Sequence, residues 1–569
     1  MTPKRGLSRR SLLAGALAAP VAVACSNGRS RPPAATPEPT AEPSGASVVI
    51  TQPPTPTIEP SPSTPRARTG GATSIASPRA FSFDTLAPHL ADDVSAIEVL
   101  GRVHSRLVQW SDFTAGVIAG DLATRWEQPD PLRLVLHVDP RARWQPHVSS
   151  GGRLTPGEVA DWLRATVSRA RGPNASPSTA RREADWLSVE QVDVVNDRVV
   201  VRLGRPDPWV FMTLAGRFSL VAHPSTFGRG ARESNAVDAV GGSGPFILEE
   251  VGHALRFRAY LDGHAPPLVE TLEVLEPAEP RAQYLSGAVD EAILRDRREA
   301  PAVRAAAPAT EWGSWYEDSP IVSTLAIDRP PWNDARLRRA LSAALNRGVL
   351  AERLFGGRAE ATGLAAPVHT AAFRQTTPPL LDGYRPRPED DIREARALWE
   401  AAGGASLGKV TVDFPSVFDP AYSASSVVID RLGEALGTGQ FVPAVESYPA
   451  IAKKAAEGRY GNGRAALWFG WGPPFAEPDP TRWASETFAE AADSAIRGAA
   501  RAIRDAPRLG DAAARFQELA ALTADGAGRG ILFWLTQKHE VARRAGLTRE
   551  RVATAWWPQH LDASLRRES

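Results

Sequence analysis

Hydrophobic and polar residues alternate in short runs along the chain, and this alternation predicts β-strands. The most regular runs are residues 132–138, 199–203, 254–260 and 410–414. A continuous hydrophobic run at 465–469 is typical of a buried strand, and 531–535 predicts a late strand near the C-terminus. Strands are therefore expected along most of the chain beyond residue 132.

Helical signals lie between the predicted strands. Thr155 is a suitable N-cap, Pro156 suits the first helical position, and Glu158 completes a capping box, so a helix is expected to begin here. A second helix is predicted over 334–354, where hydrophobic residues share one side. A third, over 389–402, is expected to end at two glycines. The alternation of strands and helices predicts a mixed α/β protein with several lobes.

The N-terminal segment has the layout of a secretory signal peptide. Basic residues precede a hydrophobic stretch that is far shorter than the ~20 residues needed to span a bilayer. Arg9 and Arg10 resemble a twin-arginine export signal. Cys25, the single cysteine of the chain, follows small residues as in a lipobox, where the cysteine becomes lipidated. Residues 1–24 are therefore predicted to be a signal peptide, and Cys25 is predicted to anchor the protein to the cell membrane from outside the cytoplasm.

Residues 25–68 are predicted to be a tether. They are rich in Pro, Thr, Ser, Ala and Glu and contain no aromatic residue. Such a segment cannot bury enough apolar surface to fold, and its prolines favour an extended spacer. The folded body is therefore expected to begin at about residue 69.

Composition and charge exclude several functional classes. The 569 residues are 43% hydrophobic and carry a formal net charge of +1, without the basic run that a nucleic-acid partner requires. One cysteine excludes an internal disulfide framework, and the ten histidines show no ligand spacing, so neither a metal site nor another cofactor is predicted. The Gly-Lys-Ser/Thr phosphate loop of an ATPase is absent, and Pro245 replaces the last glycine of a nucleophile elbow. The sequence therefore predicts a protein that is not an enzyme.

Several short motifs along the mature chain resemble, in order, those of solute-binding protein family 5 of ABC importers, which includes oligopeptide, dipeptide and nickel binders. No single motif is specific to this family, but the occurrence of seven motifs in the family's order is. They lie at residues 119–127, 132–144, 154–160, 242–246, 325–340, 344–347 and 393–403.

This resemblance implies an α/β, two-lobed periplasmic-binding-protein fold of type II, with two hinge crossings and an extra subdomain in the first lobe. Lobe I is expected at 69–322 plus 532–569, with the subdomain at about 105–222. Lobe II is expected at 323–531. The solute would lie between the lobes and be enclosed as the hinge closes.

The loop after the predicted strand at 465–469 departs from the family pattern. The family often has Gly-Trp-x-Ala-Asp-Tyr-Pro-Asp-Pro here, and in peptide binders the first Asp holds the solute's α-ammonium group. In this chain Trp471 is retained, but Pro474 stands where that Asp would fall. Glu477 is the candidate replacement carboxylate, because a cation removed from water needs a paired charge. Asp479, between two prolines, fits either solute contact or a turn.

Aromatic residues are the other candidates for the cleft wall, because they offer large, rigid contact surfaces. Each is also a possible core residue. The candidates, besides Trp471, are Trp468, Trp312, Trp315 and Tyr316, together with Phe83 and Asp84 near the start of lobe I.

The resemblance predicts a monomeric, extracytoplasmic lipoprotein that captures a small solute and delivers it to the permease subunits of an ABC importer. A peptide is the expected solute, and an opine, a sugar or a nickel chelate remains open. Two alternatives also remain open, a sensor or adhesin that has lost transport and a secreted hydrolase.

Overall fold

A computed structural model describes the chain from residue 71 to residue 549 and again at 565–567. Within that span the description has gaps, the longest at 171–185, 362–382, 455–466, 472–493 and 520–530. The predicted signal peptide and tether lie outside the described residues.

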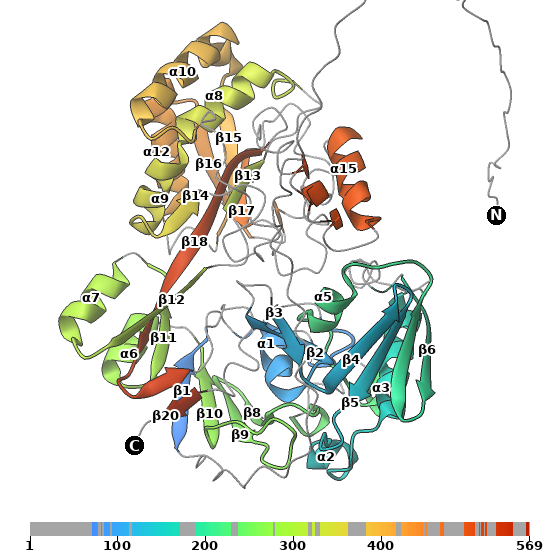
Figure 1. The fold of residues 1–569 in the computed structure, drawn as a ribbon. Helices are drawn as coiled ribbons and strands as arrows, with labels where there is room; N and C mark the ends of the chain where they lie inside the picture. Colours follow the sequence, from blue (N-terminus) through green and yellow to red (C-terminus); the bar gives the residue numbers. More distant parts are fainter. Residues whose placement is uncertain are drawn as a thin grey trace, which may run out of the picture. The chain divides into compact units, whose positions relative to one another are not determined.

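One sheet runs through most of the described chain (Figure 1). Its 12 strands follow the order β16-β15-β17-β13-β18-β11-β1-β10-β9-β8, and β12 and β14 also pair with β18. The strands are β1 (Ala72–Ala76), β8 (Phe246–Val251), β9 (Ala254–Ala259), β10 (Thr271–Leu275), β11 (Glu291–Leu294), β12 (Glu311–Tyr316), β13 (Ile321–Thr324), β14 (Ala359–Ala361), β15 (Val410–Pro415), β16 (Phe441–Glu446), β17 (Leu467–Trp471) and β18 (Ile531–Arg543).

The first group of strands, β1 and β8 to β10, surrounds a core with helix α1 (Val94–Val103). β1 is parallel to β10, and β8 and β9 continue the sheet in antiparallel pairs. Ile97 and Leu100 of α1 are buried together with Phe246 of β8 and Phe257 of β9. This group holds the carboxyl end of the parallel strand β1 in a fixed position.

A separate four-stranded antiparallel sheet, in the order β4-β5-β7-β6, packs against helix α3. The predicted strands at 132–138 and 199–203 form β5 and β7 of this sheet. Buried residues that follow β17 in the chain, including Ile503 and Phe516, join the core of this sheet. The strands of this sheet are β4 (Ala123–Asp130), β5 (Arg133–Val138), β6 (Val189–Val195) and β7 (Arg198–Leu203). The other elements of this part of the chain are β2 (Val108–Asp112), β3 (Val117–Gly120), α2 (Pro146–Ser149), α3 (Pro156–Ala170), α5 (Val210–Ala215) and α15 (Ser494–Arg504).

The last group of strands is covered by helices. β15 is parallel to β16 and β17, and Val412 and Phe414 of β15 are fully buried among helix residues such as Leu341 and Leu432. The helices are α8 (Ala335–Leu345), α9 (Arg347–Phe355), α10 (Pro388–Ala401) and α12 (Ala424–Leu436). Shorter elements elsewhere are α6 (Pro280–Ser286), α7 (Glu299–Ala306), β19 (Leu547–Arg549) and β20 (Leu565–Arg567).

Local sequence signals account for several of these boundaries. The Thr155 backbone N–H donates to the Glu158 carboxylate at 2.8 Å, and the Glu158 N–H donates to the Thr155 hydroxyl at 3.3 Å, which confirms the predicted capping box. The single helix predicted over 334–354 is instead two helices, α8 and α9. Asn346 separates them at φ 40°, and its side chain accepts the Val349 N–H as the N-cap of α9.

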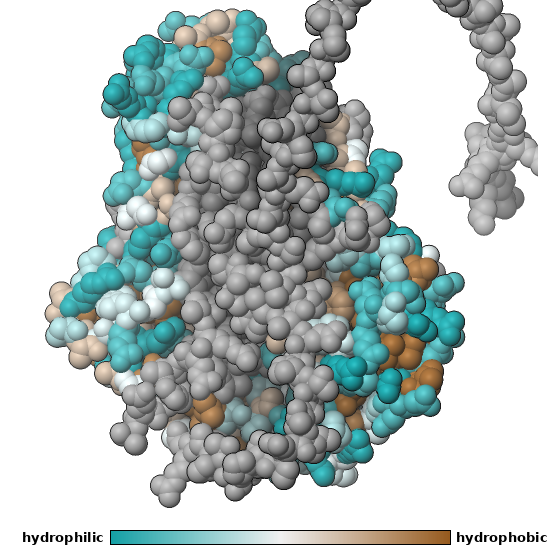
Figure 2. All heavy atoms as spheres, in the orientation of Figure 1, coloured by the Kyte–Doolittle hydropathy of each residue, from teal (hydrophilic) through white to brown (hydrophobic). Residues whose placement is uncertain are grey.

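The surface over β4 to β7 is mixed in character. Figure 2 shows hydrophobic colour beside hydrophilic colour over the part of the molecule that carries these strands in Figure 1. Leu132, Val194 and Val195 are exposed there, while Arg125 and Glu127 form an ion pair at 2.8 Å. Such scattered exposed hydrophobic residues are usual on a soluble surface.

Candidate functional site

Strand β18 lies inside the large sheet, between β13 and β11, and joins the two halves of that sheet. Residues 531–537 pair with β13 and β14, whereas residues 538–543 pair with β11 and β12. Its 13 residues span about 40 Å at the usual rise per residue. β12 and β13 are consecutive in the chain, and both lie antiparallel to β18. The chain therefore passes twice, along β12–β13 and along β18, between the first strand group, which β11 continues, and the last strand group, which β13 continues. Figure 1 shows this passage along β18.

The backbone positions of four candidate aromatic residues lie near this passage. Trp315 and Tyr316 end β12, opposite His539 and Lys538 of β18. Trp468 pairs with Thr324 of β13 and with Asp413 of β15, and Trp471 pairs with Ile321 of β13. The fold therefore brings segments that are far apart in the sequence into adjacent strands.

The remaining candidates follow the carboxyl ends of parallel strands but lie outside the described residues. Phe83 and Asp84 come after β1, and Glu477 and Asp479 come after β17. In open α/β sheets, ligands bind outside the carboxyl ends of the strands. Arg9, Arg10 and Cys25 also lie outside the described part of the chain.

One charged group near these strand ends has a structural role. Asp413 of β15 is buried, and Lys454, in the connection between β16 and β17, lies 3.4 Å from its carboxylate and 2.5 Å from Glu446. Burial opposes the charge on Lys454, but the hydrogen bond to Glu446 and both carboxylates raise the pKa of its ammonium above the usual value. The contact ties the connection to the sheet. Within the described ranges, no group of three or more His, Cys, Asp or Glu side chains could hold a metal ion.

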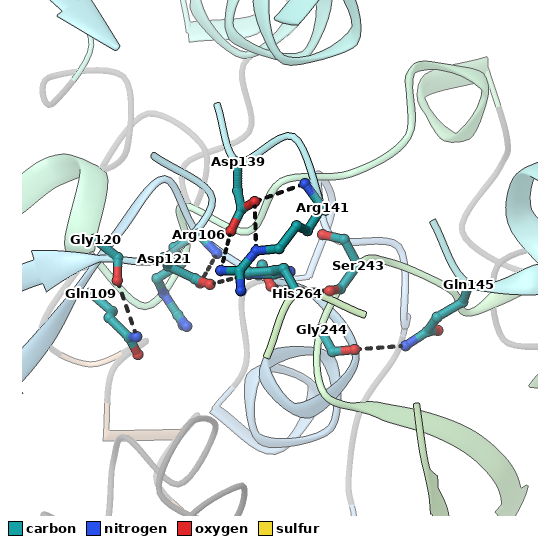
Figure 3. A network of polar contacts seen from close by, with 11 residues as sticks. Arg106, Gln109, Gly120, Asp121, Asp139, Arg141, Gln145, Ser243, Gly244 and His264 are labelled. Atoms are coloured by element: carbon teal, nitrogen blue, oxygen red, sulfur yellow. Dashed lines mark hydrogen bonds and ion pairs between the residues drawn. The ribbon is translucent and has the colours of Figure 1, made fainter. Parts of the chain in front are cut away.

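A buried polar network that sequence reasoning missed joins the four-stranded sheet to the first strand group (Figure 3). The Asp121 carboxylate accepts the Arg106 backbone N–H at 2.7 Å and lies 2.8 Å from Nε2 of His264. The Arg106 guanidinium donates to the carbonyls of Gly216 at 2.9 Å and Arg217 at 3.1 Å. Asp121 and His264 are 143 residues apart, so no local pattern signals their contact.

Charges within this network are set by burial and by their partners. Burial lowers the pKa of the Arg106 guanidinium to about 9, and the Asp121 carboxylate opposes that shift. Burial also disfavours the charged form of Asp139, but hydrogen bonds and charge from Arg141 and the charge of His264 hold its pKa below the usual value. Arg106 and Asp139 are therefore ionised at neutral pH, and the network is held by charge-assisted hydrogen bonds.

The Gly242–Phe246 motif also lies where the four-stranded sheet meets the first strand group. The Gln145 side-chain amide donates to Phe246 O at 2.7 Å, and its carbonyl accepts the Gly242 N–H at 3.3 Å. A Cβ on Gly244 would lie 2.7 Å from the backbone of Val103, so only glycine permits this approach. The motif thus positions the loop between β7 and β8 against the end of α1.

Low pH is expected to destabilise the contact between the four-stranded sheet and the first strand group through His104. Burial lowers the pKa of its imidazole to about 4, from an ordinary value of 6.5. Between these values the unfolded chain binds a proton that the folded chain does not, so stability falls as pH falls. This one group should lower the free energy of unfolding by about 2 kcal/mol at pH 5 relative to pH 7.5. Urea unfolding at both pH values should show that the free energy of unfolding depends less on pH in His104→Gln than in the parent. An equal dependence in both proteins would show that His104 does not cause the loss of stability.

Solved structures with the same fold define the class of protein. The oligopeptide-binding protein AppA of Bacillus subtilis, in complex with a nonapeptide, matches with a TM-score of 0.68 at 12% identity, over 89% of this chain and 100% of that chain. The binding protein AgaA of A. tumefaciens, in complex with agropinic acid, matches with a TM-score of 0.65 at 16% identity, over 88% and 99%. The chain therefore has the two-lobed fold of extracytoplasmic solute-binding proteins, as the sequence predicts.

Sequence comparison then gives the family. The model "bacterial extracellular solute-binding proteins, family 5 Middle" matches residues 117–484, and the chain belongs to this family of ABC-importer binding proteins. The probable deoxycholate-binding periplasmic protein YgiS of Escherichia coli K12 is 27% identical in an alignment of 346 positions that covers 56% of this chain. The matched region spans 61% of the length of that curated relative. The family and the fold are those of binding proteins rather than of enzymes.

None of the helices in the described ranges has the length and hydrophobicity of a membrane span.

Proposed function

We propose that this chain captures a peptide or peptide-like solute between two lobes and delivers it to the permease subunits of an ABC importer. The observation that carries the proposal is the pair of neighbouring strands, β12–β13 and β18, that connect the two strand groups. Two such strands allow the lobes to rotate about a hinge while they keep the lobes connected. Peptide complexes among the structural neighbours support a peptide as the solute.

We propose lobe I at 69–322 plus 532–569, including the subdomain at about 105–222, and lobe II at 323–531. The elements β2 to β7 with α3 and α5 fall within the proposed subdomain. The proposed solute contacts come from both lobes and include Trp471, Trp468, Trp315, Tyr316, Phe83, Asp84, Glu477 and Asp479. Glu477 would pair with an α-ammonium group in place of the carboxylate that Pro474 replaces.

A thermal-shift panel on the full chain with Cys25→Ser tests the proposal. The panel holds di- to pentapeptides, oligosaccharides and nickel chelates, each at about 100 times a typical dissociation constant, where binding stabilises the native state by ~2.7 kcal/mol. Peptides should raise the midpoint by a few degrees. No shift with any peptide would contradict a peptide solute.

An amphipathic carboxylate is the second candidate solute, because the curated relative is named for deoxycholate binding. Deoxycholate below its micellar concentration therefore belongs in the same panel. A shift with deoxycholate and none with peptides would select this alternative.

Loss of the lipid anchor gives a separate prediction. Cys25→Ala should move the protein from the membrane fraction to the soluble extracytoplasmic fraction, because one buried acyl methylene contributes about 0.8 kcal/mol and two chains anchor stably. Cell fractionation with immunoblotting measures the change, with Ser26→Ala as the matched control. Cys25→Ala protein that remains in the membrane fraction would refute the anchor.

A further inference from the structure

The Glu540 carboxylate lies where β18 is shared between the two strand groups. Its backbone pairs with Leu294 of β11 and Ser314 of β12, on the lobe I side of the change in partners. One carboxylate oxygen binds the guanidinium of Arg304, and the other binds that of Arg358. The Glu540 side chain is only 17% exposed, so solvent and salt screen this charge less than a surface charge.

Arg304 connects this carboxylate to lobe I. It belongs to α7, between β11 and β12, and its guanidinium lies 4.0 Å from the centre of the Trp312 ring. A guanidinium that stacks on an aromatic ring and pairs with a carboxylate is held in place by both contacts. Arg304 and Trp312 therefore fix the position of Glu540 within lobe I.

Arg358 connects the same carboxylate to lobe II. It lies between α9 and β14, and its guanidinium donates to the Asp296 carbonyl of lobe I at 3.5 Å as well as to Glu540. Its own carbonyl accepts the Lys538 N–H at 2.9 Å. The side chain is 20% exposed. Arg358 thus reaches from lobe II to two acceptors in lobe I.

We propose that Glu540 and Arg358 form a clamp that sets the resting angle between the lobes. The inference rests on the proposed function, in which the lobes rotate about their shared strands. The partners of β18 change between Gln537 and Lys538, so rotation there moves Arg358 with lobe II while Glu540 stays with lobe I. Charge-assisted hydrogen bonds act only at short range, so the ion pair stabilises the angles that keep its atoms in contact. The clamp thereby tunes solute affinity, because a shift in the population of the binding-competent angle changes the apparent dissociation constant.

Pulsed electron paramagnetic resonance on the full chain tests the clamp without any solute. Spin labels at Gln191→Cys on β6 and Ala397→Cys on α10, both exposed, report the distance between the lobes in a Cys25→Ser background. Glu540→Gln removes the charge and keeps the shape of the side chain. The fraction of molecules outside the main distance peak of the parent should rise about fivefold, the scale expected for a partly screened ion pair. An unchanged distance distribution would overturn the proposal.

Two further variants make the test specific. Glu249→Gln removes an exposed ion pair within lobe I, in which Arg258 Nε lies 2.6 Å from Glu249, and should leave the distances unchanged. Arg358→Gln breaks the clamp from lobe II and should shift the distances as Glu540→Gln does. No shift with Arg358→Gln, or an equal shift with Glu249→Gln, overturns the clamp. Failure of the proposed function would instead appear as a folded parent that binds no solute, which this experiment does not measure.

Discussion

Replacing Asp121 with alanine is expected to lower the free energy of unfolding of the protein by about 3–5 kcal/mol. The carboxylate is buried and accepts the Arg106 backbone N–H, while His264 lies at 2.8 Å on its other oxygen. The substitution leaves the buried Arg106 guanidinium without its counter-charge. Removing one partner from a buried charge network costs more than the network itself contributes, because the other charge stays desolvated. Differential scanning calorimetry of parent and variant measures the loss.

Asp161→Ala is the matched control for this experiment. Asp161 pairs with Arg164 at 2.7 Å, but both side chains are about half exposed. An exposed pair of this kind contributes about 0–1 kcal/mol. Equal, small losses in Asp121→Ala and Asp161→Ala would show that the network in Figure 3 does not stabilise the contact between the four-stranded sheet and the first strand group.

Replacing Phe414 with alanine should lower the free energy of unfolding by a similar amount, about 3–5 kcal/mol. Phe414 of β15 is fully buried in the core that this part of the sheet forms with the helices that cover it. Truncation removes buried ring surface and leaves a cavity that rigid neighbouring strands and helices fill only in part. Urea unfolding followed by tryptophan fluorescence measures the change.

Val445→Ala provides the comparison, because Val445 of β16 is the register partner of Phe414 and yet is 44% exposed. Its truncation should cost less than about 1 kcal/mol. A loss as large as that of Phe414→Ala would mean that register position, and not burial, determines stability in this sheet.

Local signals in the sequence predict many of the elements. The capping box at Thr155 and the alternation over 410–414 each specify an element from neighbouring residues, and the structure has α3 and β15 there. The break between α8 and α9 could not be predicted in this way. Hydrophobic periodicity continues across Asn346, and the side chain that stabilises the break also donates to Asp391 at 2.6 Å, 45 residues away.

The late strand shows the same limit. Its hydrophobic run predicts a strand at 531–535, but β18 extends to Arg543 through polar residues such as Gln537 and His539. Both residues are buried, Gln537 beside β14 and His539 beside β12. Tertiary pairing therefore determines the length of the strand, and a single sequence does not reveal it.

The candidate site, too, can be predicted from the sequence only in part. Motif order in the sequence is enough to identify the family and its two-lobed fold. It does not reveal His264 beside Asp121 or Arg358 beside Glu540, because each pair is assembled from segments more than a hundred residues apart. Which of the predicted aromatic and acidic residues contact the solute stays a prediction.

Isothermal titration calorimetry of the full chain with Cys25→Ser tests the central claim most directly. The titrant is the peptide that gives the largest thermal shift, and the peptide is recovered afterwards and analysed by mass spectrometry. The proposed function predicts saturable binding of one peptide per chain, with a negative heat-capacity change from apolar burial and with the peptide recovered intact. No saturable heat with any peptide would contradict capture of peptides, and a cleaved peptide would show that the protein is a hydrolase.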